Sequence, residues 1–143
     1  MTPQERADRC AALMWADDRA SQSLGMRIVS VGPGRAILEM PVRDEMVNGH
    51  GIGHGGMTFA VADSAFAFAC NSHNARTVAR ACEIRFLAPT RRGDLLVADA
   101  VERERAGRDG IYDITVRVGD AVVAEFVGHS RQVRGTFFDE EDR

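Results

Sequence analysis

Residues 47–71 constrain the fold more than any other part of the chain. The segment opens with a loop, residues 48–56, in which glycines recur at nearly every second position and allow backbone conformations that other residues resist. The remainder, residues 57–70, is apolar or small except at Thr58, Asp63 and Ser64. An amphipathic surface helix would carry polar residues every three or four positions, so this pattern predicts a central helix buried on almost all sides.

The rest of the chain predicts a second helix and a sheet. Residues 3–19 have apolar side chains at helical spacing, with Pro3 suited to a first turn. Alternating apolar residues bounded by glycine-rich turns predict strands at 24–31, 35–42, 77–88, 95–104, 112–118 and 121–133. Short connections imply antiparallel pairing, and the apolar helix supplies the cover that one sheet face needs. We therefore expect an α+β fold in which five or six antiparallel strands wrap around the long central helix.

The bulk properties limit the class of protein. A chain of 143 residues suits a single domain, with a core at about 23–134 and an acidic tail, residues 139–142, expected to fray. A net charge of −3 without any basic run argues against a nucleic-acid partner. No stretch is long and apolar enough for a signal peptide or a membrane span, so a cytoplasmic location is the default expectation.

The spacing of the cysteines and histidines indicates neither disulfide bonds nor a structural metal site. Three cysteines are an odd number and form no CxxC pair, so neither a disulfide framework nor a zinc site is indicated. His50 and His54 lie among glycines with no evident third ligand, which makes a metal site improbable. We expect no metal and no separate cofactor.

Two features of the central segment suggest chemistry when they occur together. The first turn of a helix leaves backbone N–H groups unpaired, and Gly55 and Gly56 would let a ligand oxygen approach them. Such amides can stabilise a carbonyl oxygen as it becomes an oxyanion. Asp63 is a carboxylate in an otherwise apolar helix, and carboxylates are rarely buried without a partner or a purpose. The glycines alone could serve only close packing, and Asp63 alone could pair with a buried arginine. Because both features occur in one helix, together they favour a functional site.

The sequence NGHGIGHGGMTFAVADSAFAFACNS resembles the hotdog-fold acyl-CoA thioesterases, and most closely the phenylacetate-degradation thioesterase family (PaaI type). The resemblance covers about residues 23–134 and includes further patches at 84–89, 93–94, 112–113 and 128–131. One departure is Gly53, where the family often has cysteine, and we expect this to alter a loop contact rather than the chemistry.

The resemblance implies a thioesterase acting on an aryl- or arylacetyl-CoA, such as phenylacetyl-CoA or hydroxyphenylacetyl-CoA, with coenzyme A as part of the substrate. It makes Asp63 the catalytic carboxylate and the Gly55 amide the oxyanion donor. It gives Asn48 the task of orienting the thioester or the water, and His54 that of holding the loop. The residues expected to contact substrate are Gly56, Phe59, Ser64, Ala67 and Phe68. Arginines 91, 92 and 108 could meet the coenzyme A phosphates, although we favour the simpler explanation that they are solvated turn residues.

Helix geometry adds an inference that is independent of the family. Asp63 follows Gly55 by eight residues, so the two lie roughly 12 Å apart along one helix. A nucleophile and an oxyanion donor must both come within about 3 Å of the reacting carbonyl. We therefore expect Asn48 and Gly55 of one chain to face Asp63 of a partner across a two-fold axis. The resembled family usually pairs two such dimers into a tetramer.

Two other functions stay open on the sequence alone. A hotdog acyl-CoA hydratase or dehydratase would need a catalytic histidine, which here would be His50 or His54. A non-catalytic acyl-CoA-binding module would keep the pocket and lose turnover. Within hydrolysis itself, Asp63 could act as general base or as nucleophile.

Overall fold

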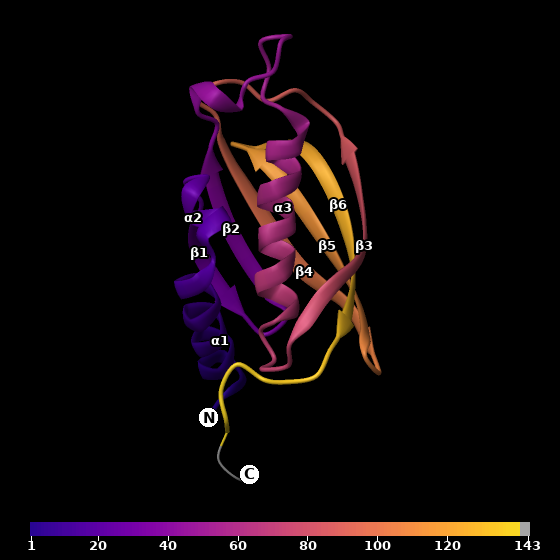
Figure 1. Ribbon diagram of the computed structural model, residues 1–143. Helices are drawn as coiled ribbons and strands as arrows, with labels where there is room; N and C mark the ends of the chain where they lie inside the picture. Colours follow the sequence, from indigo (N-terminus) through magenta and orange to yellow (C-terminus); the bar gives the residue numbers. More distant parts are fainter. Residues whose placement is uncertain (141–143) are drawn as a thin grey trace.

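The long apolar helix and the sheet around it dominate the computed structural model, which describes residues 1–140. Helix α3, Gly55–Cys70, lies across the concave face of one six-stranded antiparallel sheet (Figure 1). The predicted α+β hotdog architecture, with six strands and an additional N-terminal helix, is confirmed. Helix α3 begins two residues earlier than expected, so that both glycines of the loop lie in its first turn.

The sheet differs from chain order at one edge. Its strands are β1 Arg27–Gly32, β2 Arg35–Pro41, β3 Thr77–Phe86, β4 Leu95–Ala106, β5 Asp109–Val118 and β6 Ala121–Gln132. In space their order is β1-β2-β4-β5-β6-β3, so the strand that follows α3 crosses to the far edge and the next returns to the centre. Strand β5 begins at Asp109, three residues before the predicted strand 112–118, because Asp109 still pairs with Ala106 across a tight hairpin.

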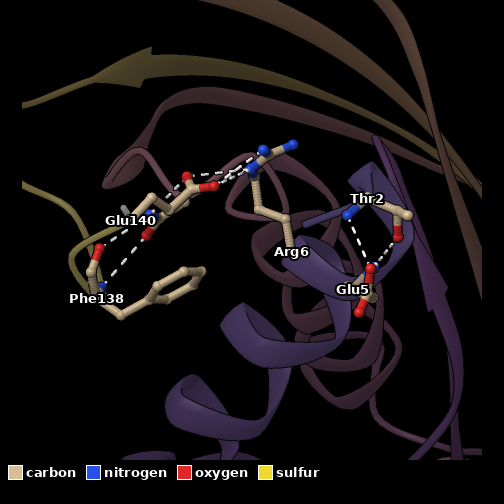
Figure 2. Close-up of polar contacts among 6 residues, drawn as sticks. Thr2, Glu5, Arg6, Phe138 and Glu140 are labelled. Atoms are coloured by element: carbon tan, nitrogen blue, oxygen red, sulfur yellow. Dashed lines mark hydrogen bonds and ion pairs between the residues drawn. The ribbon is translucent and has the colours of Figure 1, made fainter. Parts of the chain in front are cut away.

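The N-terminal helix is interrupted where one helix was expected. It consists of α1, Pro3–Asp17, and α2, Arg19–Ser23, which lie beside β1 (Figure 1). The break falls at Asp18, whose carboxylate accepts a hydrogen bond from the Ser21 N–H at 2.9 Å and caps α2. At the start of α1, Thr2 and Glu5 form a capping box (Figure 2). No helix within residues 1–140 combines the length and apolar character that a bilayer crossing requires.

The C-terminal segment packs against α1 instead of fraying. Glu140 accepts hydrogen bonds from Arg6 Nε at 3.0 and 3.1 Å (Figure 2) and from Asn74 Nδ2 at 3.1 Å. The guanidinium of Arg9 lies 4.2 Å from the centre of the buried Phe138 ring. The expectation of a frayed tail is therefore wrong for Glu140, because paired charges and an aromatic anchor hold it. Residues 141 and 142 lie outside the described residues.

Edge strand β3 is far more exposed than the rest of the sheet. Within residues 1–140 it pairs with β6 alone, and of its described side chains Cys82 and Ile84 pack partly against the core. At its C-terminal end the apolar side chains of Phe86 and Leu87 are 56% and 53% exposed. An exposed edge with apolar side chains is a surface that a second chain can cover.

Close packing of α3 on the sheet depends on a glycine in β6. A Cβ atom built on Gly128 would stand 2.7 Å from three atoms of the buried Phe66 ring. That ring also packs at a tilt on Tyr112 and Phe126, with centroids 5.6 and 6.0 Å away. These contacts prevent the Phe66 ring from moving away from an added methyl group.

We expect Gly128→Ala to lower the free energy of unfolding by about 1–3 kcal/mol, because the added methyl overpacks the helix–sheet contact. Urea denaturation followed by circular dichroism measures the change. Glu125→Ala, at an exposed position of the same strand, is the matched control and should stay within about 0.5 kcal/mol of wild type. Equal effects of the two variants would contradict this account of the core.

Candidate active site

A cavity of about 450 Å³ opens beside the first turn of α3. Asn48, Gly53 and Gly55 line it from the glycine loop and the helix, and residues 86–90 line it from the end of β3 and the turn that follows. The cavity therefore joins two of the residues predicted for catalysis, Asn48 and Gly55, at the positive end of a buried helix.

His54 holds the loop and caps α3. Its Nδ1 accepts a hydrogen bond from the Gly56 N–H at 2.9 Å, so the neutral ring carries its proton on Nε2. The His54 N–H donates to the Met46 carbonyl at 2.7 Å and fixes the loop to the preceding 3-10 helix η1, Asp44–Met46. The Gly56 amide, predicted as a substrate contact, is thus engaged within the protein.

The amide of Gly55 is differently placed. Its N–H donates no hydrogen bond to any residue in the described range 1–140, and Gly55 lines the cavity. A Cβ at this position would stand 3.2 Å from the ring of Phe86, so an added side chain would press on that exposed ring. An unpaired amide at a helix N-terminus, in a residue that lines a cavity, is suited to bind a carbonyl oxygen or an oxyanion.

The side-chain oxygen of Asn48 accepts hydrogen bonds within the loop, whereas its NH2 group does not donate within the described residues. Its Oδ1 accepts from the N–H groups of His50 at 2.9 Å and Ile52 at 3.4 Å, which stabilises the turn of the glycine loop. Its Nδ2 group donates no hydrogen bond to the described part of the chain. The Asn48 amide therefore remains available as a donor at the cavity wall.

Asp63 lies two turns further along α3 and outside this cavity. It is half-buried, and it forms neither a hydrogen bond nor an ion pair with another residue in the range 1–140, so the buried-arginine explanation does not apply. Burial raises the pKa of Asp63 above the usual aspartate range. A half-buried carboxylate that lacks a neutralising partner destabilises the fold, which is typical of functional groups.

The thiols near this carboxylate are poor nucleophiles. Burial raises the pKa of Cys70 to about 12, and burial followed by the charge of Asp63 raises the pKa of Cys82. Both thiols stay protonated at neutral pH, which leaves Asp63 as the reactive group of this part of the helix.

The other residues predicted to bind substrate lie along α3, away from the cavity. Ser64 hydrogen bonds to Ser21 of α2, with oxygens 2.8 Å apart. Phe59 packs edge-on against Phe126, with centroids 5.1 Å apart, and the buried Phe68 packs on Trp15 at 6.2 Å. Ala67 is half-buried, and its carbonyl accepts hydrogen bonds at the end of the helix. A contact between these side chains and substrate stays a prediction.

Sequence reasoning missed the opposite wall of the cavity. Phe86 and Thr90 line that wall, and Thr58 lines the cavity from α3; Thr58 and Thr90 are only 3% and 4% exposed. The available signals were the consecutive apolar residues Phe86 and Leu87, where strand alternation breaks, and the family resemblance of residues 84–89. Nothing local marked Thr90, because its position depends on a contact with the distant glycine loop. Among residues 1–140, no cluster of three or more His, Cys, Asp or Glu side chains could hold a metal ion.

Comparisons with known proteins agree with this architecture. The model of the thioesterase superfamily matches residues 50–125. The chain is 42% identical to the acyl-coenzyme A thioesterase PaaI of Escherichia coli, over 88% of this chain and 91% of that protein.

Solved structures extend the match to three dimensions. The E. coli PaaI protein from the phenylacetic acid degradation operon superposes with a TM-score of 0.92 at 40% identity, covering 94% of this chain and 99% of that one. The phenylacetic acid degradation protein PaaI of Thermus thermophilus has a TM-score of 0.79 at 33% identity, covering 81% and 100% of the two chains. This chain therefore belongs to the thioesterase superfamily and, within it, to the hotdog-fold acyl-CoA thioesterases of the PaaI type.

Proposed function

We propose that the protein hydrolyses the thioester of an aryl- or arylacetyl-CoA, releasing the free acid and coenzyme A. The observation that carries this proposal is the unpaired Gly55 amide at a cavity wall that also contains Asn48. A thioester carbonyl oxygen bound there would meet one backbone donor, one side-chain donor and the positive end of the helix dipole. These groups interact more strongly with the oxyanion of the transition state than with the neutral carbonyl, which is the condition for catalysis.

The carboxylate of this reaction would come from a second chain. Asp63 does not line the cavity, and eight residues of helix separate it from Gly55 by roughly 12 Å. The exposed edge of β3, with Phe86 and Leu87 at its end, adjoins the cavity and offers a surface for pairing. In this proposed arrangement a two-fold axis creates two equivalent sites per dimer, and two dimers assemble as a tetramer in the cytoplasm.

Two chemical routes use the same groups. As general base, Asp63 takes a proton from water, whose oxygen attacks the thioester carbon; collapse of the oxyanion breaks the carbon–sulfur bond and expels the coenzyme A thiolate. As nucleophile, the Asp63 carboxylate attacks that carbon directly, expels the same thiolate and leaves a mixed anhydride, which water opens to the acid and free Asp63. Both routes need Asp63 ionised and the oxyanion held at Gly55.

The histidines give little support to a hydratase or dehydratase. The Nδ1 of His54 accepts the Gly56 amide proton, which ties the ring to the helix cap. His50 is exposed on the loop, and neither ring lines the cavity. Moving protons at the α and β carbons of an acyl group would require a histidine within reach of both.

The acyl group is proposed from the relatives. The similar proteins of E. coli and T. thermophilus are named for phenylacetic acid degradation, which favours an arylacetyl substrate here. Arg91 and Arg92 follow the cavity residue Thr90, and both are exposed, so they could meet the coenzyme A phosphates outside the cavity. Arg92 pairs with Asp44 at 3.0 Å in the free chain, and the phosphates would compete with this exposed ion pair.

Removing the carboxylate tests the reaction. We expect Asp63→Ala and Asp63→Asn to lower kcat at least about a thousandfold, because base and nucleophile are both lost. Thiol release from phenylacetyl-CoA, hydroxyphenylacetyl-CoA, benzoyl-CoA, hexanoyl-CoA and crotonyl-CoA measures it, with Asp120→Asn, on an exposed turn, as control. Near-normal release in both Asp63 variants would refute the role of Asp63.

The same panel separates the alternative functions. Loss of the crotonyl enoyl absorbance without thiol release would indicate a hydratase. Binding of the acyl-CoA without either change would indicate a non-catalytic module.

Mixed oligomers test whether two chains share each site. Asn48→Ala and Asp63→Asn chains are assayed separately and after co-expression. A mixed dimer carries one intact site, made of Asn48 from one chain and Asp63 from the other, and one site with both substitutions. Random pairing then restores about a quarter of wild-type activity. A mixture no more active than its components would mean that Asn48 and Asp63 act within one chain.

The raised pKa of Asp63 predicts the direction in which Tm and kcat/KM change with pH. Its raised pKa means that the folded chain holds this proton more tightly than the unfolded chain, so the ionised group costs stability as pH rises through that pKa. We expect Asp63→Asn to raise the Tm at pH 7, with the gain shrinking as pH falls through the raised pKa and vanishing by about pH 4, and wild-type kcat/KM to fall on acidification above the ordinary aspartate range. Thermal denaturation and rate profiles between about pH 4 and 8 measure both. A Tm gain that grows towards low pH would contradict the assignment.

A further inference from the structure

We propose that Thr90 is a positioning residue for the proposed hydrolysis. Its side chain fills the space beside Gly53 and so holds the loop that presents Asn48 and Gly55 at the cavity. The inference rests on the proposed function for its catalytic consequence, and on packing alone for the pairing of residues 53 and 90.

Gly53 and Thr90 are in direct contact although distant in sequence. The Gly53 N–H donates to the Thr90 carbonyl at 2.8 Å, and both residues line the cavity. A Cβ atom built on Gly53 would overlap the Thr90 Oγ1, and it would stand 3.2 Å from the Thr90 Cβ. Thr90 therefore occupies the space that any side chain at position 53 would need.

Space, not backbone conformation, requires glycine at position 53. Gly51, two residues earlier, has φ +81°, a conformation that favours glycine, whereas Gly53 is not among the residues with positive φ. Thr90 is also a stiff obstacle, because a β-branched side chain has few accessible χ1 rotamers and rotation would leave its Cβ at the same short distance.

The contact lies between the two groups proposed to hold the thioester. Val47 forms a β-bridge with Gly53, which closes the loop that carries Asn48, and His54 and Gly55 follow directly. Displacing Gly53 would therefore shift the Asn48 amide and the Gly55 N–H relative to each other. A misplacement of about 1 Å in such donors can lower the rate about a hundredfold.

The other end of the contact is anchored. The Asp94 side chain accepts from the Arg91 N–H at 2.8 Å, and the Asp94 carbonyl accepts from the Val42 N–H at 2.8 Å. The turn after Thr90 is thus tied to the end of β2. Before Thr90, the N–H groups of Leu87 and Ala88 donate to the Val123 carbonyl at 2.9 and 3.3 Å, so the buried Thr90 is held from both sides. A side chain added at position 53 must consequently displace the loop, because Thr90 cannot yield.

A double-mutant cycle tests the pairing. We expect Gly53→Ala to lower kcat at least about tenfold in the wild-type background, and less than about twofold in a Thr90→Gly background, where the nearest remaining Thr90 atom is backbone carbon at 3.6 Å. Thr90→Gly alone should lower kcat more than it changes KM. Thr90→Val, which keeps the side-chain shape, should stay within about twofold of wild type. Gly49→Ala is the matched control, because a Cβ there meets nothing within 4 Å.

Each contrary result has a defined meaning. Full activity and Tm in Gly53→Ala, or additive losses in the double variant, would overturn the pairing. A fall in Tm with unchanged kcat would reduce Thr90 to a purely structural residue, and a loss in Thr90→Val equal to that in Thr90→Gly would assign the hydroxyl a substrate contact instead. Tm is measured for all variants, so the pairing can still be read if the wild-type protein releases no thiol from any acyl-CoA. That result would refute the proposed function alone.

Discussion

Burial of an almost wholly apolar helix is the constraint on which the rest of this structure depends. Helix α3 has no polar face to turn to water, so protein must cover most of its circumference. The curved sheet covers one side, and α1 and α2 lie beside β1 and flank α3 at that edge (Figure 1). Contact between helix and sheet is close enough that Phe66 rests directly on the backbone at Gly128. The cost of ordering the long strands is offset by the apolar area that this single helix removes from water.

The buried position of α3 also leaves an unpaired backbone amide at the start of the helix, where it can bind a ligand. Backbone amides at a helix N-terminus need partners, and here His54 satisfies Gly56 while Gly55 remains unpaired at the cavity. Asp63 is also unusual, because its carboxylate is half-buried and forms no hydrogen bond or ion pair within residues 1–140. The helix keeps these two groups apart within one chain, which is why we propose a site shared between two chains.

Sequence reasoning succeeded where the physical signal is local. The apolar run of α3 and the alternation in β5 and β6 reflect periodic burial, so the helix and most strand ends could be placed to within a few residues. Asn48, Gly55 and Asp63 stood out because glycine-rich loops and buried carboxylates are chemically unusual. It failed at Asp18, which caps a new helix turn, and at Glu140, whose partner Arg6 lies at the other end of the chain.

The sequence by itself determined the elements, the α+β class and two of the residues that line the cavity, because hydrophobic period and turn chemistry act over a few residues. Only the tertiary structure decided that β3 occupies the outer edge, that a cavity forms between the glycine loop and residues 86–90, and that Thr90 fills the space beside Gly53. These arrangements depend on packing between segments far apart in the chain. No periodicity within either segment encodes such a contact, because it exists only once the helix and sheet have brought the two together.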